Sequence, residues 1–260
     1  MTLSDVYSAL VSERGVEIEV GVPYAAHSRC ALDIYRPRQP SATHPIVLFF
    51  YGGGWRSGER ATYRFVGSAL AARGIITVIP DYRLFPQVAF PAFVKDGARA
   101  FAWVADNLAQ AGQSIIVAGH SAGAHTAALL ALDPSYLKGQ KPAGLVGLSG
   151  PYAFDPTTWP TTRDIFVRAA GMPNLARPVA FASSSAPPAL LLHGASDALV
   201  KPWNSIELTQ KLRDAARDVQ AETFAGIGHM GLLLAISRPF RWRAPVLERM
   251  VAFVKRHNPV

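Results

Sequence analysis

The chain has 260 residues, of which 50% are hydrophobic and 17% charged, with 21 glycines, 20 prolines and a formal net charge of +8. This composition suits a globular domain with a large core and excludes a disordered tail, a collagen-like fibre and a disulfide-stapled miniprotein. The single cysteine, Cys30, cannot form an internal disulfide. No signal-peptide pattern is apparent and no apolar run reaches the ~20 residues that span a bilayer, so we expect a cytoplasmic protein.

Short apolar runs bounded by turn residues recur along the chain. Residues 17–20 and 31–35 alternate polar with apolar side chains, as an exposed antiparallel edge does. Later runs are apolar on both faces, which is typical of strands inside a parallel sheet. These runs are residues 46–50, 75–79, 114–118, 144–149 and 189–193.

Segments with helical periodicity lie between these runs. Apolar residues spaced by three or four occupy 90–108, with Pro91 suited to a first helical turn and Gly112 to a stop, and the pattern returns over 247–254. Strands that alternate with helices predict an α/β fold, with a mostly parallel sheet and helices on both faces. Such sheets bind ligands at the carboxyl ends of their strands.

Residues 151–188 interrupt this alternation. They contain seven prolines, several aromatic residues and no clear strand. The segment is too long for an ordinary loop, so we expect it to form a lid or a small cap over the sheet edge. No linker-like composition divides the chain, which predicts one domain over residues 1–260 with this insertion.

The strongest chemical signal is the sequence Gly-His-Ser-Ala-Gly at 119–123. A strand-like run precedes it and a helix-like run, 124–132, follows. A serine on a strand-to-helix elbow projects from the sheet, and glycines two residues before and after it relieve the crowding. We therefore interpret Ser121 as a nucleophile.

A serine hydroxyl needs a base, and the base needs an orienting acid. Elbow-type serine enzymes have the chain order Ser, then Asp or Glu, then His. Asp197 follows the run that ends at residue 193, and His229 follows Thr223-Phe224, so both are expected on loops at strand ends. Alternatively, Asp197 caps the helix that starts near Pro202, or His229 is a structural loop histidine.

The remaining histidines are interpreted as structural. His120 and His125 belong to the elbow and the helix behind it and are expected to pack, whereas His193 ends a strand and is expected to support its surroundings by hydrogen bonds. No set of His, Cys and Asp has metal-ligand spacing, so we predict neither a metal nor a cofactor.

A glycine-rich loop, Tyr-Gly-Gly-Gly-Trp at 51–55, directly follows the run 46–50. Three glycines let the backbone turn N–H groups toward a ligand, as an oxyanion hole requires, and Trp55 can line a pocket. A phosphate cradle is the alternative, but both glycine-rich phosphate-binding patterns are absent from this loop.

With these motifs assembled, the chain resembles the α/β-hydrolase superfamily, and within it the hormone-sensitive-lipase-like carboxylesterases and the kynurenine-formamidase-like enzymes. The resemblance runs from about Leu32 to the C-terminal helix. Besides the elbow it includes Asp-Tyr-Arg-Leu at 81–84, followed by Phe-Pro at 90–91. In this order the motifs are specific for the fold and less so for the substrate.

The resemblance implies that Ser121 is the nucleophile, Asp197 the acid and His229 the base. It also implies a structural, salt-bridged brace beneath the site that contains Asp81 and Arg83. The oxyanion donors that it implies are the backbone N–H groups of Gly53, Gly54 and Ala122.

One position departs from the family pattern. The family usually begins its oxyanion loop with His-Gly-Gly-Gly, whereas this chain has Tyr51. A tyrosine hydroxyl can still donate one hydrogen bond to hold the loop, but its size differs.

We expect a serine carboxylesterase that cleaves small esters with short-chain or aromatic acyl groups through an acyl-enzyme. The alternatives are an arylformamidase-like amidase, which uses the same triad, and a non-catalytic ligand-binding member of the fold, against which His229 argues. The side chains expected in the substrate pocket are Tyr51, Trp55, Tyr152 and Phe154.

Much of the positive charge lies in residues 236–260, where six basic residues face one acid and Trp242 and Phe240 interleave with arginines. This pattern could bind single-stranded nucleic acid, but a terminal helix with a solvated basic face is the favoured interpretation. We therefore expect a small-molecule ester as partner, and neither nucleic acid nor membrane. The sequence leaves the oligomeric state open, a homodimer included.

Overall fold

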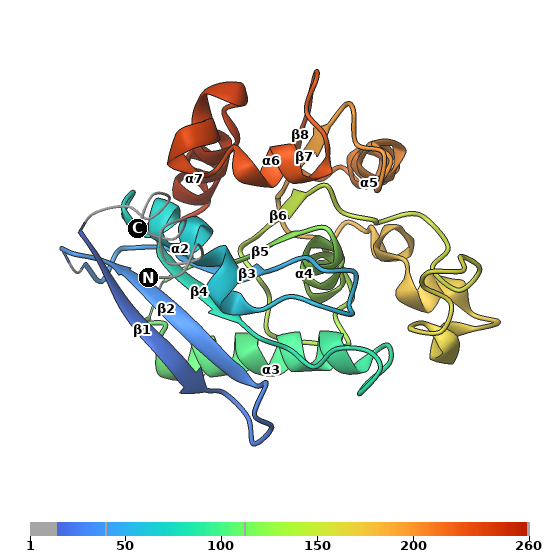
Figure 1. Cartoon of the computed structure of the whole chain (residues 1–260), viewed down its shortest axis with the longest axis horizontal. Coiled ribbons are helices and arrows are strands. Elements are labelled where there is room, and N and C mark those ends of the chain that lie inside the picture. Colours follow the sequence, from blue (N-terminus) through green and yellow to red (C-terminus); the bar gives the residue numbers. More distant parts are fainter. Residues whose placement is uncertain (1–14, 40, 112, 259–260) are drawn as a thin grey trace.

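An eight-stranded sheet forms the centre of the computed structural model, which describes residues 15–39, 41–111 and 113–258 (Figure 1). The strands lie in the order β1-β2-β4-β3-β5-β6-β7-β8. Their bounds are β1 Val16–Pro23, β2 Ala31–Pro37, β3 Ile46–Phe50, β4 Ile76–Pro80, β5 Ile115–His120, β6 Gly144–Leu148, β7 Ala189–Gly194 and β8 Val219–Phe224.

The sheet is antiparallel at one edge and parallel elsewhere. β1 pairs with β2, and β2 with β4, in antiparallel register, whereas β4, β3, β5, β6, β7 and β8 are successive parallel neighbours. The strands β3 to β7 are buried along their whole length, which confirms the five predicted apolar runs to within two residues at each end. β8 is not among those runs because its exposure alternates, as expected of an edge strand.

Helices cover both faces of the sheet, which confirms the predicted α/β class (Figure 1). On one face α2 packs against α7, and on the other α3 packs against α4, while α5 contacts β7 and β8. The helices are α2 Arg64–Ala71, α3 Ala92–Asn107, α4 Ala122–Leu132, α5 Trp203–Asp214, α6 His229–Leu234 and α7 Val246–Arg256. None of the described helices is long and apolar enough to cross a membrane.

The segment 151–188 contains neither an α-helix nor a β-strand. Three short 3-10 helices occupy it instead: η2 Val167–Ala169, η3 Pro173–Ala176 and η4 Pro178–Phe181. η4 packs against both α4 and α5, so the end of the segment is joined to the main body.

The basic C-terminal region is partly neutralised within the fold. Arg249 is paired with Glu222, and Arg256 lies 3.5 Å from Asp218. The apolar side of α7 is buried, which agrees with a terminal helix that has a solvated basic face. Trp242, in the 3-10 helix η5 (Arg238–Arg243), is 83% exposed.

The elbow between β5 and α4 depends on close backbone packing. A Cβ atom on Gly123 would overlap the carbonyl group of Phe50 in β3, and one on Gly119 would overlap the backbone of Gly123. Helix α4 is largely apolar, with His125 and Thr126 as its polar residues, and is buried throughout except for Ala131. Glycine at 119 and 123 therefore lets a fully buried helix begin directly beside the neighbouring strand.

Two separate ion pairs brace this part of the fold. Arg60 contacts both Asp33, at 2.6 Å, and Asp81, whereas Arg83 forms a two-pronged pair with Asp96 at 2.8 Å. The expected brace therefore exists, but Asp81 and Arg83 belong to different pairs. Asp96 is fully buried and is also paired with Arg99, so two arginines compensate its charge.

Substitution of Gly123 by alanine tests the close approach of α4 to β3. We expect Gly123→Ala to lower the free energy of unfolding by roughly 3 kcal/mol, because backbone must move to admit the methyl group. Gly231→Ala in α6 is the control: its Cβ would meet Ile227 at an ordinary 3.5 Å, and the change should be neutral or stabilising by up to about 1 kcal/mol. Urea unfolding measures the stability of both variants. Equal free energies of unfolding would contradict the close packing of α4 on β3.

Candidate active site

Ser121 occupies a strained turn between β5 and α4. Its backbone angles are φ 55° and ψ −123°, a region that residues other than glycine rarely adopt. Its N–H donates to the carbonyl of Leu148 at 2.9 Å, and its carbonyl accepts from His125 N at 3.1 Å, so both sides hold the turn. Strain of about 1–3 kcal/mol persists where the surroundings enforce it, which is often at functional sites. The elbow predicted from 119–123 is therefore present.

Asp197 and His229 are in direct contact. Asp197 lies between β7 and α5, and its Oδ2 is 2.7 Å from Nδ1 of His229. Its Oδ1 accepts from the amides of Leu199 and Val200 at 3.0 and 2.9 Å. These amides, rather than the start of α5, are the partners of Asp197, so it does not cap that helix. His229 is the first residue of α6, a correction to the expected loop position.

The surroundings keep Asp197 ionised although it is 2% exposed. Burial acts to raise the pKa of its carboxyl group, but hydrogen bonds from His229 and the Val200 amide outweigh burial and hold the pKa below its usual value. An ionised carboxylate only accepts hydrogen bonds, so Nδ1 of His229 carries a proton and donates it. Nε2 of His229 is then the nitrogen left for proton exchange.

His193 supports the loop that carries Asp197. Its Nε2 lies 2.8 Å from the carbonyl of Val200 and 3.4 Å from Asp197, and its Nδ1 lies 2.7 Å from the hydroxyl of Ser205. A carbonyl only accepts, so Nε2 is the donor and the Ser205 hydroxyl donates to Nδ1. Burial lowers the pKa of His193, which keeps the ring neutral and agrees with the supporting role predicted.

His120 joins His229 to the elbow. The two imidazole rings are 4.7 Å apart, and Nε2 of His120 lies 3.3 Å from the carbonyl oxygen of His229. Burial, followed by the nearby His229, lowers the pKa of His120 to about 3, so its ring is neutral at physiological pH. This contact holds the backbone of His229 against the residue that precedes Ser121.

The hydroxyl of Ser121 and the imidazole of His229 are not hydrogen-bonded to each other in this structure, although the neighbouring His120 touches His229. In ligand-free enzymes this catalytic hydrogen bond is often long and tightens only when substrate binds. The structure thus brings Asp197 and His229 together directly and places His229 beside the elbow.

Free backbone donors lie beside Ser121. Within the described part of the chain, the amides of Gly53, Gly54 and Ala122 meet no acceptor. Gly54 and Ala122 line the same pocket as Ser121, and Ala122 is the first residue of α4, where amides lack intrahelical partners. This arrangement can stabilise negative charge that develops on a bound carbonyl oxygen.

Tyr51 anchors the glycine-rich loop from beneath. Its ring is fully buried and stacks on Tyr82 at 4.7 Å, and its carbonyl accepts from the Tyr82 hydroxyl at 2.7 Å. Its own hydroxyl accepts a hydrogen bond from Arg29 at 2.9 Å. Arg29 also donates to the carbonyls of Gly58 and Tyr82, so it clamps the loop, a role that sequence analysis did not identify.

A pocket of about 530 Å³ opens at Ser121. The oxyanion loop, the elbow, the segment 151–188 and the Asp197 loop contribute its walls, which are mostly apolar. The lining residues are Gly54, Trp55, Arg56, Ser121, Ala122, Pro151, Phe154, Thr161, Thr162, Leu199 and Val200.

The four side chains expected in the substrate pocket divide into two pairs. Trp55 and Phe154 line the pocket beside Ser121. Tyr51 and Tyr152 do not, because both are fully buried in the core. The Tyr152 ring fills the space that Gly147 and Gly150 leave by lacking a Cβ, so it packs beneath the sheet edge and not into the pocket.

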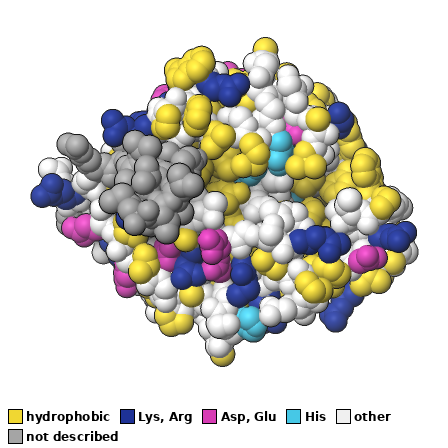
Figure 2. Space-filling model, in the orientation of Figure 1, with side chains coloured by type: hydrophobic (Ala, Val, Ile, Leu, Met, Phe, Trp, Pro, Cys, Tyr) yellow, Lys and Arg dark blue, Asp and Glu magenta, His cyan; other side chains and the backbone are white. Residues whose placement is uncertain are grey.

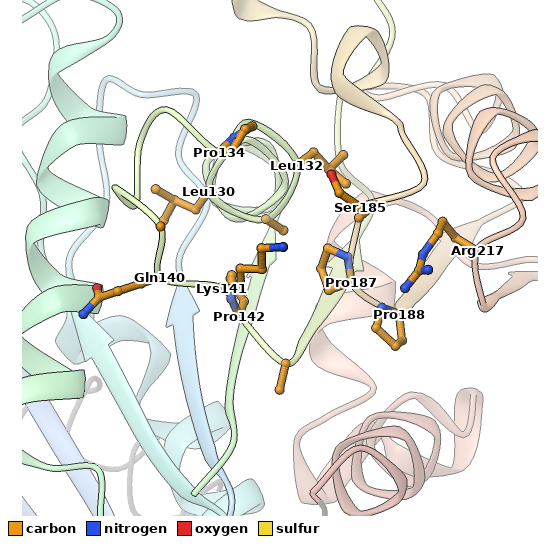
Figure 3. A pocket seen from close by; sticks show the side chains of 14 residues that line it. Leu130, Leu132, Pro134, Gln140, Lys141, Pro142, Ser185, Pro187, Pro188 and Arg217 are labelled. Carbon is orange, nitrogen blue, oxygen red and sulfur yellow. The ribbon is translucent and has the colours of Figure 1, made fainter. Parts of the chain in front are cut away.

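The molecule has a cluster of hydrophobic side chains on one face and a second pocket. Hydrophobic side chains gather around a histidine near the centre of the face shown in Figure 2. A separate pocket of about 240 Å³ lies between the end of α4 and the loops that precede β6 and β7, and contains none of the predicted site residues (Figure 3).

Among the described residues, no group of three or more His, Cys, Asp or Glu side chains could hold a metal ion.

Comparison with known proteins finds two family models and several esterases. The BD-FAE model matches residues 32–141, and the prolyl oligopeptidase family model matches residues 92–258. The chain is 30% identical to esterase LipC and 32% identical to esterase LipQ of Mycobacterium tuberculosis, over 76% and 75% of this chain and 56% and 52% of those proteins. It therefore spans about half the length of the curated relatives it matches.

The fold is shared with solved esterase structures. Esterase B from Lactobacillus rhamnosis superimposes with a TM-score of 0.81 at 17% identity, covering 98% of this chain and 90% of that one. At this level of identity the likeness concerns the fold alone.

The neutral buried histidines predict loss of stability in acid. Burial lowers the pKa of His125 from 6.5 to about 4, so protons that bind the unfolded chain below pH 6.5 are not bound by the folded protein. The stabilisation of the folded protein that the neutral His125 provides is therefore complete above pH 6.5. It is lost as pH falls toward about 4. We expect the unfolding free energy to fall less steeply in His125→Gln, whose amide can still donate to Ala176 but does not titrate. Urea titrations between about pH 7 and pH 4.5 measure the unfolding free energy of the wild type and of His125→Gln. If this free energy fell equally steeply with falling pH in both proteins, the prediction would be contradicted.

Proposed function

The chain belongs to the hormone-sensitive-lipase-like carboxylesterases of the α/β-hydrolase superfamily, and on that premise we propose that it hydrolyses small carboxylic esters through an acyl-enzyme on Ser121. The observation that carries this proposal is the 2.7 Å contact between Asp197 and His229 beside a strained serine elbow. Esterases among its relatives support the same activity.

In the proposed first half-reaction, Nε2 of His229 takes the proton of the Ser121 hydroxyl as its oxygen attacks the ester carbonyl. The carboxylate of Asp197 stabilises the imidazolium that forms. The amides of Gly53, Gly54 and Ala122 hold the oxyanion, and the tetrahedral intermediate collapses as His229 returns the proton to the departing alcohol.

In the second half-reaction water replaces the alcohol. His229 removes a proton from the water as it attacks the acyl carbonyl, and the same amides hold the second oxyanion. As this intermediate collapses, His229 returns the proton to the oxygen of Ser121, which restores its hydroxyl and releases the carboxylic acid. The chain's own residues supply every proton transfer, so the proposed mechanism uses neither a metal nor a cofactor.

The dimensions of the pocket support short or aromatic acyl groups. At about 530 Å³ it is open to the surface, with Trp55 and Phe154 as flat apolar walls. We propose that the segment 151–188 is the cap that completes these walls, since Phe154, Thr161 and Thr162 lie in it. A single domain with this insertion, a cytoplasmic location and the absence of a nucleic-acid partner stay predictions.

The two other functions expected from the sequence make different demands on this site. A non-catalytic ligand-binding protein has no need for an Asp197–His229 contact or for unpartnered amides at the elbow. An arylformamidase needs the same groups, so substrate preference separates it from an esterase.

Turnover of p-nitrophenyl acetate by Ser121→Ala tests the proposal. We expect kcat to fall by up to about 10⁶, as in a comparable triad, while thermal unfolding stays close to that of the wild type. Ser185→Ala, an exposed serine outside the pocket, is the control and should keep full turnover.

Turnover retained by Ser121→Ala would contradict the assignment of the nucleophile. If the wild type instead cleaves an aryl formamide faster than p-nitrophenyl acetate by orders of magnitude, the enzyme is an amidase.

A further inference from the structure

The pocket at Ser121 contains one uncompensated charge. Among the described residues that line it, Arg56 is the only charged one. No described carboxylate lies within ion-pair distance of its guanidinium, unlike Arg60 and Arg83, which are paired. An exposed cation of this kind at the wall of a mostly apolar pocket favours a ligand that brings its own negative charge.

Two neutral groups contact the guanidinium group of Arg56. Its central carbon lies 4.4 Å from the centre of the Phe85 ring, and Nη2 donates to the carbonyl of Thr161 at 3.3 Å. These contacts place the planar group between Phe85, in the loop that follows β4, and the segment 151–188, without neutralising its charge. A guanidinium has five N–H donors, so donors remain for a two-pronged bond to a carboxylate.

Arg56 is also tied to the reacting centre by the chain itself. It follows Gly54 and Trp55, so the same short loop carries a proposed oxyanion donor, an apolar wall and the cation. A substrate whose ester carbonyl sits at Ser121 would lay its apolar part on Trp55. Its far end would then meet Arg56.

We propose, on the premise of the esterase function above, that the substrates are esters that also carry a free carboxylate, and that Arg56 binds this carboxylate. The charge increases the encounter rate and the affinity for such esters, whereas neutral esters of the same size bind through the apolar walls alone. Arg56 is thus a specificity-determining residue.

Matched pairs of esters test the proposal. For a carboxylate on the acyl side, mono-4-nitrophenyl adipate is compared with 4-nitrophenyl heptanoate. For one on the alcohol side, 4-acetoxybenzoate is compared with its methyl ester. We expect kcat/KM to favour the charged member of at least one pair by about tenfold or more, and the preference to fall as salt rises from about 20 mM to about 500 mM.

Variants then assign this preference to Arg56. Arg56→Met should lower the ratio of charged to neutral turnover at least about tenfold, chiefly through KM, and Arg56→Lys should retain part of the ratio. Arg168→Met, at an exposed arginine of the segment 151–188 that does not line the pocket, should leave the ratio unchanged.

Each contrary result has its own meaning. If the wild type hydrolyses neutral esters and shows no preference for the charged members, the inference about Arg56 is overturned and the esterase function stands. The same holds if Arg56→Met slows both members of a pair equally, because Arg56 would then only support the pocket wall. If no ester, p-nitrophenyl acetate included, is hydrolysed, the proposed function itself fails.

Discussion

Helix α4 starts directly beside β3, and this close approach sets where Ser121 and the first amide of α4 lie. Gly123 permits the approach because any side chain there would overlap the carbonyl of Phe50. The helix can then turn straight out of β5, which forces Ser121 into a left-handed conformation. The same approach sets the start of α4 beside the loop that follows β3, so the amides of Ala122 and Gly54 line one pocket. A helix placed further from the sheet would separate Ser121 from the amides that we propose as oxyanion donors.

Burial separates the roles of the histidines around this elbow. His120 and His193 are deeply buried, and both have a lowered pKa, so they remain neutral and serve as hydrogen-bonding supports. His229 makes the short contact with the ionised carboxylate of Asp197, at 2.7 Å, whereas His193 lies 3.4 Å from it. The supports act on the two ends of that pair: His193 holds the loop of Asp197, and His120 holds the backbone of His229. The pair that we propose for proton transfer is thereby positioned by two histidines that stay neutral.

The sequence predicts those parts of the structure whose chemistry is local. Ser121 is recognisable because its glycines must lie two residues away on either side, and the buried strands because both of their faces are apolar. Arg29 carries no such signal, since its partners Tyr51 and Tyr82 are 22 and 53 residues distant and become neighbours only in the folded sheet. Which acid pairs with which arginine is equally non-local, so Asp81 and Arg83 could be chosen as brace residues without revealing that their partners are Arg60 and Asp96. Tyr152 shows the same limit, because an aromatic residue in a proline-rich segment does not disclose whether it faces a pocket or the core.

The convergence of Ser121, Asp197 and His229 is tested most directly by reaction with a small alkyl fluorophosphonate, followed by intact-mass measurement and peptide mapping. We expect a single adduct on Ser121, formed at least about a thousandfold more slowly in His229→Ala and in Asp197→Asn, because both changes deprive the serine of its oriented base. An adduct on another residue, or a labelling rate that does not depend on His229, would contradict it.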